Sequence, residues 1–412
     1  MSGTLVAQAI TFSLSFVLAR LYLPDDFGRY SIFAGCAGVL AAAATCAFDR
    51  VILLAGPFET ARKAATLTLV SAGAVALAIM IIAQLLTLLG IGAILPIPVI
   101  DVIAFIPAFI FCYAASQVFV YSSLREDRVR SLAILKVTQS AIMGVVQLVA
   151  AGFTLVSGLI LGNVAGWFVL MVAGLQWRWQ AGHVREDVRI GSLIEVARQN
   201  WQYPRYIMPN ELIDNLSNQI PLILIGTFLS LSQAGHYGLA IMILSAPTAV
   251  VGQAVGQSFL QYLGKHGDDT EAVRRYMYRI WFALASIGLL PFSAILFHGQ
   301  PIFGIAFGTS WLEAGNIAQS LAVLLFVRFI SSPTSTIYLK LNMQREQWRF
   351  CIAAAIYRTA SYALGIFGYE LATMIVVHVA SEIIAIFLYN LTALKRLKSL
   401  RLEGPQPREV FE

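Results

Sequence analysis

Apolar residues fill most of the chain in long runs that short polar or basic segments separate. A helix needs about 20 mostly apolar residues to cross the hydrocarbon core of a bilayer. With a window of that length, the sequence predicts twelve membrane-spanning helices. We expect them near residues 3–19, 31–48, 66–90, 99–122, 131–152, 156–177, 206–228, 234–261, 278–297, 316–337, 350–367 and 371–392. Among the loops that connect these spans on the non-cytoplasmic side, the longest is expected at 298–315.

The composition agrees with this pattern and excludes several classes of protein. Of 412 residues, 58% are hydrophobic and only 12% are charged, whereas soluble proteins carry about 25% charged residues. So few charges could not cover the surface of a soluble fold, which argues against a cytosolic enzyme, a disordered protein and a nucleic-acid binder. The four cysteines lie in apolar runs without Cys or His spacing, so we expect no disulfide framework, metal site or cofactor. No cleavable signal peptide is expected.

Basic residues alternate from one predicted loop to the next. The loops after the second, fourth, sixth, eighth and tenth spans, together with the C-terminal tail, hold nearly all of the 28 Lys and Arg residues. The opposite loops hold only Arg20 and Arg29. Cytoplasmic loops of membrane proteins carry the excess of Lys and Arg. We therefore expect both termini on the cytoplasmic side.

A short internal repeat divides the chain into halves. Residues 24–30 read PDDFGRY and residues 231–237 read LSQAGHY, so Gly-x-Tyr recurs after 207 positions (235 − 28). A chance recurrence is the alternative, but the offset is close to half the chain, as in transporters built from two related bundles. The sequence therefore predicts an all-α integral membrane protein with two six-helix lobes related by a pseudo-two-fold axis. The expected divisions are a first lobe at 1–177, a cytoplasmic linker with a short amphipathic helix at 178–204, a second lobe at 205–392 and a basic cytoplasmic tail at 393–412.

Segments rich in glycine, proline and apolar residues recur in a fixed order along the chain. They are Gly3–Ile10, Ala19–Tyr30, Gly158–Gly162, Gln219–Pro221 and Ala246–Gln257. In order and spacing these segments resemble the bacterial O-antigen and exopolysaccharide (Wzx-type) flippases of the MOP (multidrug/oligosaccharidyl-lipid/polysaccharide exporter) superfamily. The resemblance covers nearly the whole chain. One departure is Asp49, since many relatives have Glu before the position of Arg50.

The resemblance implies a MATE-like fold and a transport function without enzymatic activity. Such a protein moves undecaprenyl-diphosphate-linked oligosaccharide repeat units across the bacterial inner membrane by alternating access. The implied partners are the lipid-linked oligosaccharide and membrane lipids, with a polysaccharide polymerase and a chain-length regulator as further candidates. The alternative is a cation-coupled multidrug or other small-molecule exporter of the same superfamily.

Ionisable residues inside the predicted spans point to the second lobe. A central Arg or Asp costs about 2.5–3.5 kcal/mol on insertion scales, so such residues face a cavity or a partner. Arg328 and Arg358 lie in spans 10 and 11, and His378 and Glu382 share one face of span 12. The guanidinium group donates bidentate bonds to phosphate, which makes both arginines candidate ligands of a substrate diphosphate. The structural alternative is that Arg328 or Arg358 pairs with Glu382 or Asp214.

Polar residues also follow one face of the seventh span. Glu211, Asp214, Asn215 and Asn218 recur at helical spacing, and Gln219 follows. We expect Asn215, Asn218 and Gln219 to meet sugar hydroxyls. Arg50, at the inner end of span 2, either captures the anionic substrate or anchors its helix at the headgroups. Asp214, Glu382 and His378 are the candidates for a coupling proton or sodium ion, since burial makes a carboxyl group switchable.

Overall fold

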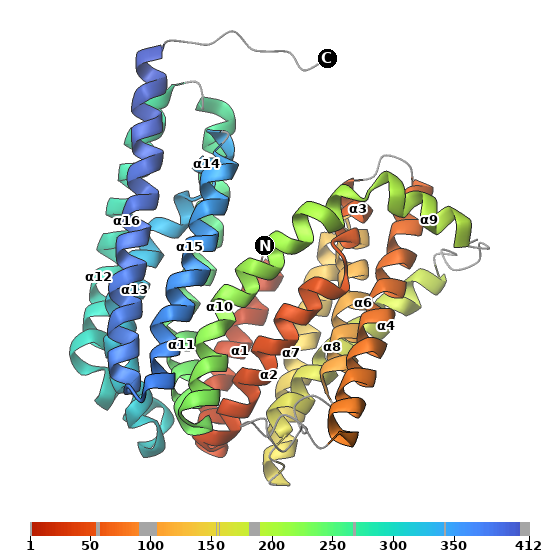
Figure 1. Ribbon diagram of the computed structural model, residues 1–412, viewed down its shortest axis with the longest axis horizontal. Helices are drawn as coiled ribbons and strands as arrows, with labels where there is room; N and C mark the ends of the chain where they lie inside the picture. Colours follow the sequence, from red (N-terminus) through yellow and green to blue (C-terminus); the bar gives the residue numbers. More distant parts are fainter. Residues whose placement is uncertain are drawn as a thin grey trace. The chain divides into compact units, whose positions relative to one another are not determined.

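The chain is almost entirely helical in the computed structural model (Figure 1). The structure describes residues 2–54, 58–89, 105–153, 155, 157–180, 190–266, 269–341 and 343–403. These residues form two compact units, Met1–Gly238 and Leu239–Glu412. The boundary between the units falls inside a long helix, so it does not coincide with the linker at 178–204. The division into two lobes is expected from the repeat in the sequence and not from contacts, and it stays a prediction.

The first unit consists of a bundle of long helices and two short helices. Its long helices are α1 (Ser2–Leu21), α2 (Pro24–Ala44), α4 (Phe58–Leu88), α6 (Ile106–Arg125), α7 (Val129–Gly152), α8 (Gly158–Gln180) and α10 (Met208–Phe228). The short helices are α3 (Phe48–Leu54) and α9 (Ile190–Gln199), and a π-helical turn, Tyr203–Ile207, precedes α10. Helix α9 lies within the linker predicted to contain a short helix. On this helix Val196 is buried, whereas the apolar side chains of Ile190 and Ile194 are exposed.

The second unit is built mainly from four long helices. Helix α11 (Leu231–His266) crosses the boundary between the units and is followed by α12 (Thr270–Phe307), α13 (Leu312–Ser331), α14 (Ile337–Lys340), α15 (Gln344–Ala363) and α16 (Leu371–Glu403). Helix α12 packs along α13, and α16 packs against α13 and α15. The side chain of Asp269 caps α12 by accepting bonds from the backbone N–H groups of Glu271 and Ala272.

The described helices agree with the predicted spans. Ten of them are long and apolar enough to cross a membrane. Helices α1 and α10 fall at the predicted spans 1 and 7, but α1 contributes only a shorter apolar stretch, Val6–Leu21. The all-α membrane architecture is therefore confirmed, and the count of twelve stays a prediction. The hairpin break after Gly152 also lies where the sequence places it.

Two boundaries differ from the expectation. The segment after Pro24, which falls between the spans predicted at 3–19 and 31–48, is the first turn of α2. Proline suits this start because at the first helical position it lacks only an N–H that has no partner there. Asp26 accepts a bond from the backbone N–H of Leu23 at 3.1 Å and so caps this start. The loop expected at 298–315 is also largely helical, since α12 continues to Phe307 with a kink at His298.

The two copies of the repeat contact each other inside the first unit. A Cβ atom on Gly28 would overlap the carbonyl group of Leu231, and a Cβ atom on Gly235 would overlap the carbonyl group of Pro24. Leu231 follows Pro24 by the same 207 positions (231 − 24) that separate the glycines. The contact is therefore reciprocal, as at a two-fold axis. Only glycine permits this approach of backbone to backbone.

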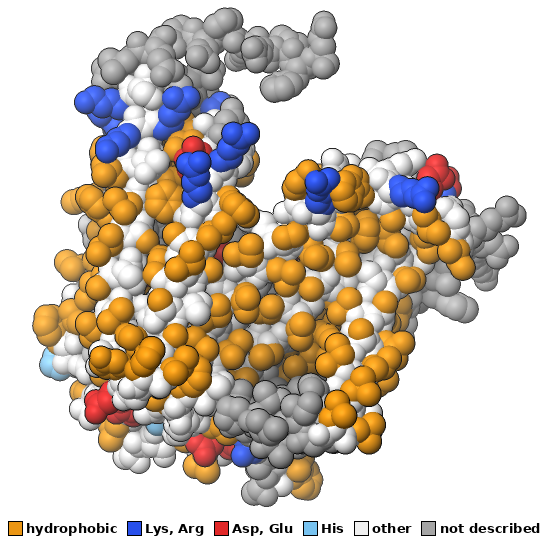
Figure 2. All heavy atoms as spheres, viewed as in Figure 1, with side chains coloured by type: hydrophobic (Ala, Val, Ile, Leu, Met, Phe, Trp, Pro, Cys, Tyr) orange, Lys and Arg blue, Asp and Glu red, His pale blue; other side chains and the backbone are white. Residues whose placement is uncertain are grey.

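The surface of each unit matches a protein that spans a membrane. Large apolar side chains such as Phe282 (77% exposed) and Leu290 (79% exposed) point away from the core of the second unit. In Figure 2 the basic side chains of this unit gather at one end, where α16 ends, and hydrophobic side chains cover the middle. In the first unit, basic side chains gather around α3 and α9. An apolar band with charges at its ends is the pattern expected in a bilayer.

Candidate functional site

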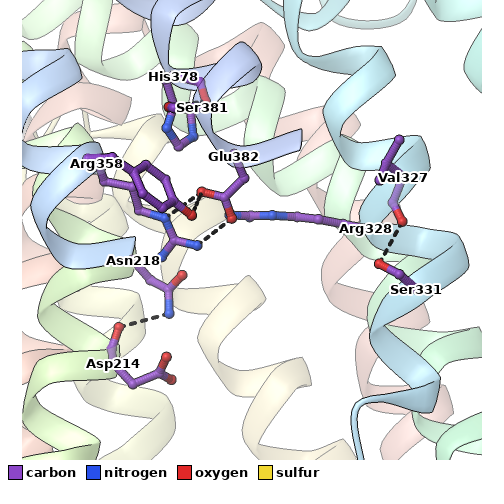
Figure 3. A network of polar contacts seen from close by, with 10 residues as sticks. Asp214, Asn218, Val327, Arg328, Ser331, Arg358, His378, Ser381 and Glu382 are labelled. Atoms are coloured by element: carbon purple, nitrogen blue, oxygen red, sulfur yellow. Dashed lines mark hydrogen bonds and ion pairs between the residues drawn. The ribbon is translucent and has the colours of Figure 1, made fainter. Parts of the chain in front are cut away.

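A buried carboxylate organises the polar residues of the second unit. Glu382, in the middle of α16, is 3% exposed. Arg358 of α15 binds this carboxylate in a bidentate manner, donating from Nε to Oε2 at 2.8 Å and from Nη2 to Oε1 at 2.6 Å. Arg328 of α13 donates from Nη2 to Oε1 at 2.5 Å, and the hydroxyl of Tyr357 donates to Oε2 at 2.7 Å. Figure 3 shows both guanidinium groups converging on this carboxylate. These four residues are called the Glu382 cluster below.

The two arginines of the Glu382 cluster are held differently. Arg358 is buried and uses two nitrogens of its guanidinium group in the bidentate contact. The side chain of Arg328 is 28% exposed and reaches Glu382 through Nη2. One carboxylate faces two guanidinium groups, so the four side chains together carry a formal charge of +1. Both arginines thus pair with Glu382, as in the structural alternative, and Arg328 is the more exposed of the two.

The backbone around Arg328 explains its position. The sequence places this arginine near the middle of a span, but α13 ends at Ser331, so Arg328 lies in its last turn. Pro333 cannot continue the helix, and a 3-10 turn over Ser332–Thr334 follows. A basic residue in the last turn of a helix is favoured by the helix dipole. The dipole and the carboxylate of Glu382 thus act on the same guanidinium group.

His378 lies one helical turn before Glu382 on α16. It is 3% exposed, and its ring centroid lies 5.3 Å from that of Tyr362. Its Nδ1 atom is buried without a hydrogen-bond partner among the described residues. The structure therefore brings together Arg328, Arg358, His378 and Glu382, four of the residues that the sequence singled out.

The polar face of α10 belongs to the first unit. Asn215 and Asn218 donate to backbone carbonyl groups of their own helix, at Glu211 and Asp214, over 2.8 and 2.9 Å. Asp214 and Asn218 are exposed. Polar side chains avoid lipid, so we expect these two to face a polar space. Gln219 packs against Gly35 of α2. The three amides thus do not form a single group around one point.

Arg50 has a partner that the sequence did not assign to it. Its Nη2 atom donates to Oε1 of Glu211 at 2.7 Å, which links α3 to α10. The guanidinium group also lies over the ring of Tyr121, 5.1 Å from the centroid. The side chains of Arg50 and Glu211 are 39% and 27% exposed. This ion pair is therefore much more accessible to water than the Glu382 cluster.

Asp49 is a residue whose surroundings the sequence did not reveal. It is 5% exposed, and its Oδ1 atom has no hydrogen-bond partner among the described residues. Burial raises the pKa of its carboxyl group, and Arg50 partly opposes this effect. The sequence shows only an aspartate beside an arginine, which does not reveal that the carboxylate is buried. In the structure Arg50 bonds Glu211.

No metal site accompanies these clusters within the described part of the chain, where no three His, Cys, Asp or Glu side chains come together. The chemistry available is therefore ionic and hydrogen-bonding. Two arginines with one carboxylate can hold an anion, and isolated carboxyl groups can exchange protons. Both properties suit the transport of a charged solute through a bundle of apolar helices.

The fold is similar to that of solved membrane transporters. It is similar to an inward-facing multidrug resistance MATE family transporter of the MOP superfamily, with a TM-score of 0.67 and 14% identity over 96% of both chains. It is also similar to lipid II flippase MurJ in an inward closed conformation, with a TM-score of 0.75 and 11% identity over 97% of this chain and 89% of that one. At these identities the likeness shows the fold.

Sequence similarity identifies the family within this class. A family model described as "Polysaccharide biosynthesis protein" matches residues 17–316, and the chain belongs to this family. Teichuronic acid biosynthesis protein TuaB of Bacillus subtilis (strain 168) is 22% identical over 139 residues, which cover 34% of this chain and 29% of TuaB. The resemblance noted in the sequence is thus confirmed at the level of the polysaccharide biosynthesis family, and the fold is similar to that of a MOP superfamily transporter.

Proposed function

We propose that this multi-pass membrane protein is a flippase that moves undecaprenyl-diphosphate-linked oligosaccharide repeat units across the bacterial inner membrane by alternating access. The family, which is that of polysaccharide biosynthesis proteins, supports the substrate class. The similar structures are transporters, one of them a lipid II flippase, and they support transport rather than enzymatic chemistry. The observation that carries the proposal is the net positive Glu382 cluster, which joins α13, α15 and α16 within three candidate membrane spans.

The role proposed for Arg328 follows from the charge of the substrate. A diphosphate brings about two negative charges into a medium of low dielectric constant, where an unpaired anion is very unfavourable. Arg328 is partly exposed and can turn donors toward that anion. Arg358 then keeps Glu382 neutralised while Arg328 is engaged with substrate. Asn215 and Asn218 are proposed to meet sugar hydroxyls, and Arg50 and Gln219 stay candidate binding residues.

The remaining assignments belong to the same proposal. Both termini are cytoplasmic, so a C-terminal alkaline phosphatase fusion should be inactive, and an active fusion would reverse the orientation. The partners are the lipid-linked oligosaccharide and membrane lipids, with a polysaccharide polymerase and a chain-length regulator acting beside it. Asp214, His378 and Glu382 remain candidates for ion coupling. Glu382 is the weakest of the three because all four of its bonds stabilise the charged form.

A second candidate function is cation-coupled export of small molecules, favoured by the likeness to a multidrug resistance transporter. Two arginines in the interior are unsuited to a cationic drug, because like charges repel at low dielectric constant. A cation exporter should therefore lose nothing, or gain, when Arg328 is neutralised. A lipid-diphosphate flippase should lose its activity.

The test compares variants in a strain that lacks the gene. Arg328→Ala should abolish surface polysaccharide while the amount of protein in the membrane stays normal. Arg328→Lys should retain part of the export, since it keeps the charge without the bidentate geometry. Arg345→Ala, at an exposed position of α15, is the matched control and should export normally. Full export by Arg328→Ala would refute the proposed role of this residue.

A further inference from the structure

The backbone before Asp49 adopts an unusual conformation. Cys46 and Ala47, which connect α2 to α3, have φ angles of 48° and 55°. Neither is glycine, and a left-handed conformation is unfavourable at such residues. Two in succession persist only where the surrounding structure holds them. This connection turns the chain so that Asp49 enters the first turn of α3 and is buried.

The buried surroundings of Asp49 provide only some of the hydrogen bonds that its carboxylate can accept. Phe48, Val51 and Ile52 on the same helix pack with Ala64 and Ala65 of α4. The hydroxyl of Thr45 and the backbone N–H of Arg50 act on the carboxylate, but Oδ1 has no partner among the described residues. A buried carboxylate with an unsatisfied oxygen is unfavourable, and binding a proton removes the charge.

The charged and ionisable groups around Asp49 come from four neighbouring elements. Arg50 is its neighbour on α3, Glu211 acts on it from α10, and Tyr113 lies close on α6. The π-helical turn adds Tyr203, which packs on the apolar residues of α3. One arginine is therefore shared by two carboxyl groups, of which one is buried and the other partly exposed.

We propose that Asp49 is a proton-binding site that controls the Arg50–Glu211 ion pair between α3 and α10. When Asp49 is protonated, it does not compete for Arg50, whose Nη2 atom bonds Oε1 of Glu211 at 2.7 Å as in this structure. When Asp49 releases the proton to water, its carboxylate competes with Glu211 for the same guanidinium group. An accessible ion pair is weak because water screens it, so a second anion beside Arg50 is enough to weaken it further. The link between α3 and α10 then loosens.

This site deepens the proposed function, because alternating access requires contacts that form in one state and break in another. It places a coupling proton in the first unit, at a residue different from Asp214, His378 and Glu382. The binding of the proton itself requires no substrate. It can therefore be measured whether or not the chain exports a lipid-linked oligosaccharide.

The first experiment detects the proton on the full chain in lipid nanodiscs by infrared spectroscopy. As the pH is lowered, the C=O stretch of a protonated carboxylic acid should appear at a higher pH than for an exposed carboxyl group, and it should vanish in Asp49→Asn. Asp127→Asn is the control, since Asp127 is exposed and asparagine tolerates its positive φ of 57°. In Glu211→Gln the band should titrate at lower pH, because Asp49 then has Arg50 to itself. A spectrum unchanged by Asp49→Asn would overturn the proposal.

The second experiment follows the link between the helices. Spin labels at positions 54 and 216, both exposed in the chain, report the distance between α3 and α10 once the native cysteines are replaced by alanine. Raising the pH should lengthen and broaden this distance, Asp49→Asn should keep it short at every pH, and Glu211→Gln should keep it long. A pH response that survives Asp49→Asn, or no response in the parent, contradicts the control of the ion pair. If Arg328→Ala exports normally while these responses hold, only the proposed function fails.

Discussion

Glu382 and Asp49 are both buried carboxyl groups, but their surroundings have opposite consequences. Glu382 accepts four hydrogen bonds, three of them from guanidinium groups, and so is fixed in its charged form. Asp49 has an oxygen without a partner among the described residues, and the nearest arginine is bonded elsewhere. Equal burial therefore does not imply equal chemistry. The number of donors decides whether a buried carboxylate is a fixed anchor or a group that exchanges protons.

The largest effect is expected when the anchor of the second unit is removed. Glu382→Gln keeps the shape of the side chain but removes the negative charge that Arg328 and Arg358 both bond. Removing one partner of a buried ion pair destabilises a protein by about 3–5 kcal/mol. Thermal unfolding of the purified protein in detergent should show this loss. Glu313→Gln, at an exposed position of α13, should leave the midpoint unchanged. Equal midpoints for both variants would mean that Glu382 is no anchor.

The first unit should depend on close backbone packing more than on its ion pair. A Cβ atom in Gly28→Ala meets the carbonyl group of Leu231, which cannot rotate away as a side chain can. We expect a loss of about 1–3 kcal/mol from overpacking. Gly38→Ala lies on the same helix with nothing within 4 Å of the added methyl group, and is the matched control. If both variants unfold at the same denaturant concentration, the close backbone contact at Gly28 does not stabilise the first unit.

A smaller change tests whether all four donors to Glu382 contribute. Tyr357→Phe removes the hydroxyl that donates to Oε2 at 2.7 Å and leaves both arginines in place. A hydrogen bond to a charged group contributes about 1.5–3 kcal/mol. Chemical denaturation should therefore place Tyr357→Phe between the parent and Glu382→Gln. Tyr369→Phe, at an exposed position before α16, serves as control and should match the parent.

The smallest effect is expected at the accessible ion pair. Glu211→Gln removes the partner of Arg50, but both side chains are in contact with water, and such pairs contribute about 0–1 kcal/mol. The unfolding free energy should therefore shift by less than 1 kcal/mol, and the shift should shrink further at high salt. A loss as large as that of Glu382→Gln would show that the two ion pairs do not differ in the way described.

Much of the fold could be predicted from the sequence, because apolar runs and basic loops depend on local composition. The start of α2 was missed since Pro24-Asp25-Asp26 suits a turn and a helix start equally. The extent of α12 was missed because the polar residues near His298 and Gln300 suggest a loop, yet the helix continues through a kink.

The candidate site was predictable only in part. Arg328, Arg358, His378 and Glu382 stand out as ionisable residues in apolar runs, and tertiary contacts do bring them together. Their mutual distances depend on how α13, α15 and α16 pack, which no local pattern encodes. The pairing of Arg50 with Glu211 joins residues 161 positions apart. The left-handed conformation of Cys46 and Ala47 has no local signal, since neither residue favours it.

The reciprocal contact of the repeat makes each copy depend on the other. Gly28 leaves room for the backbone of the second copy, and Gly235 leaves room for the backbone of the first. Neither glycine can be replaced without displacing a segment that the other copy supplies. A side chain added at one position therefore disturbs the start of both helices, α2 and α11, and a second substitution in the other copy cannot relieve it, since the group in the way is backbone.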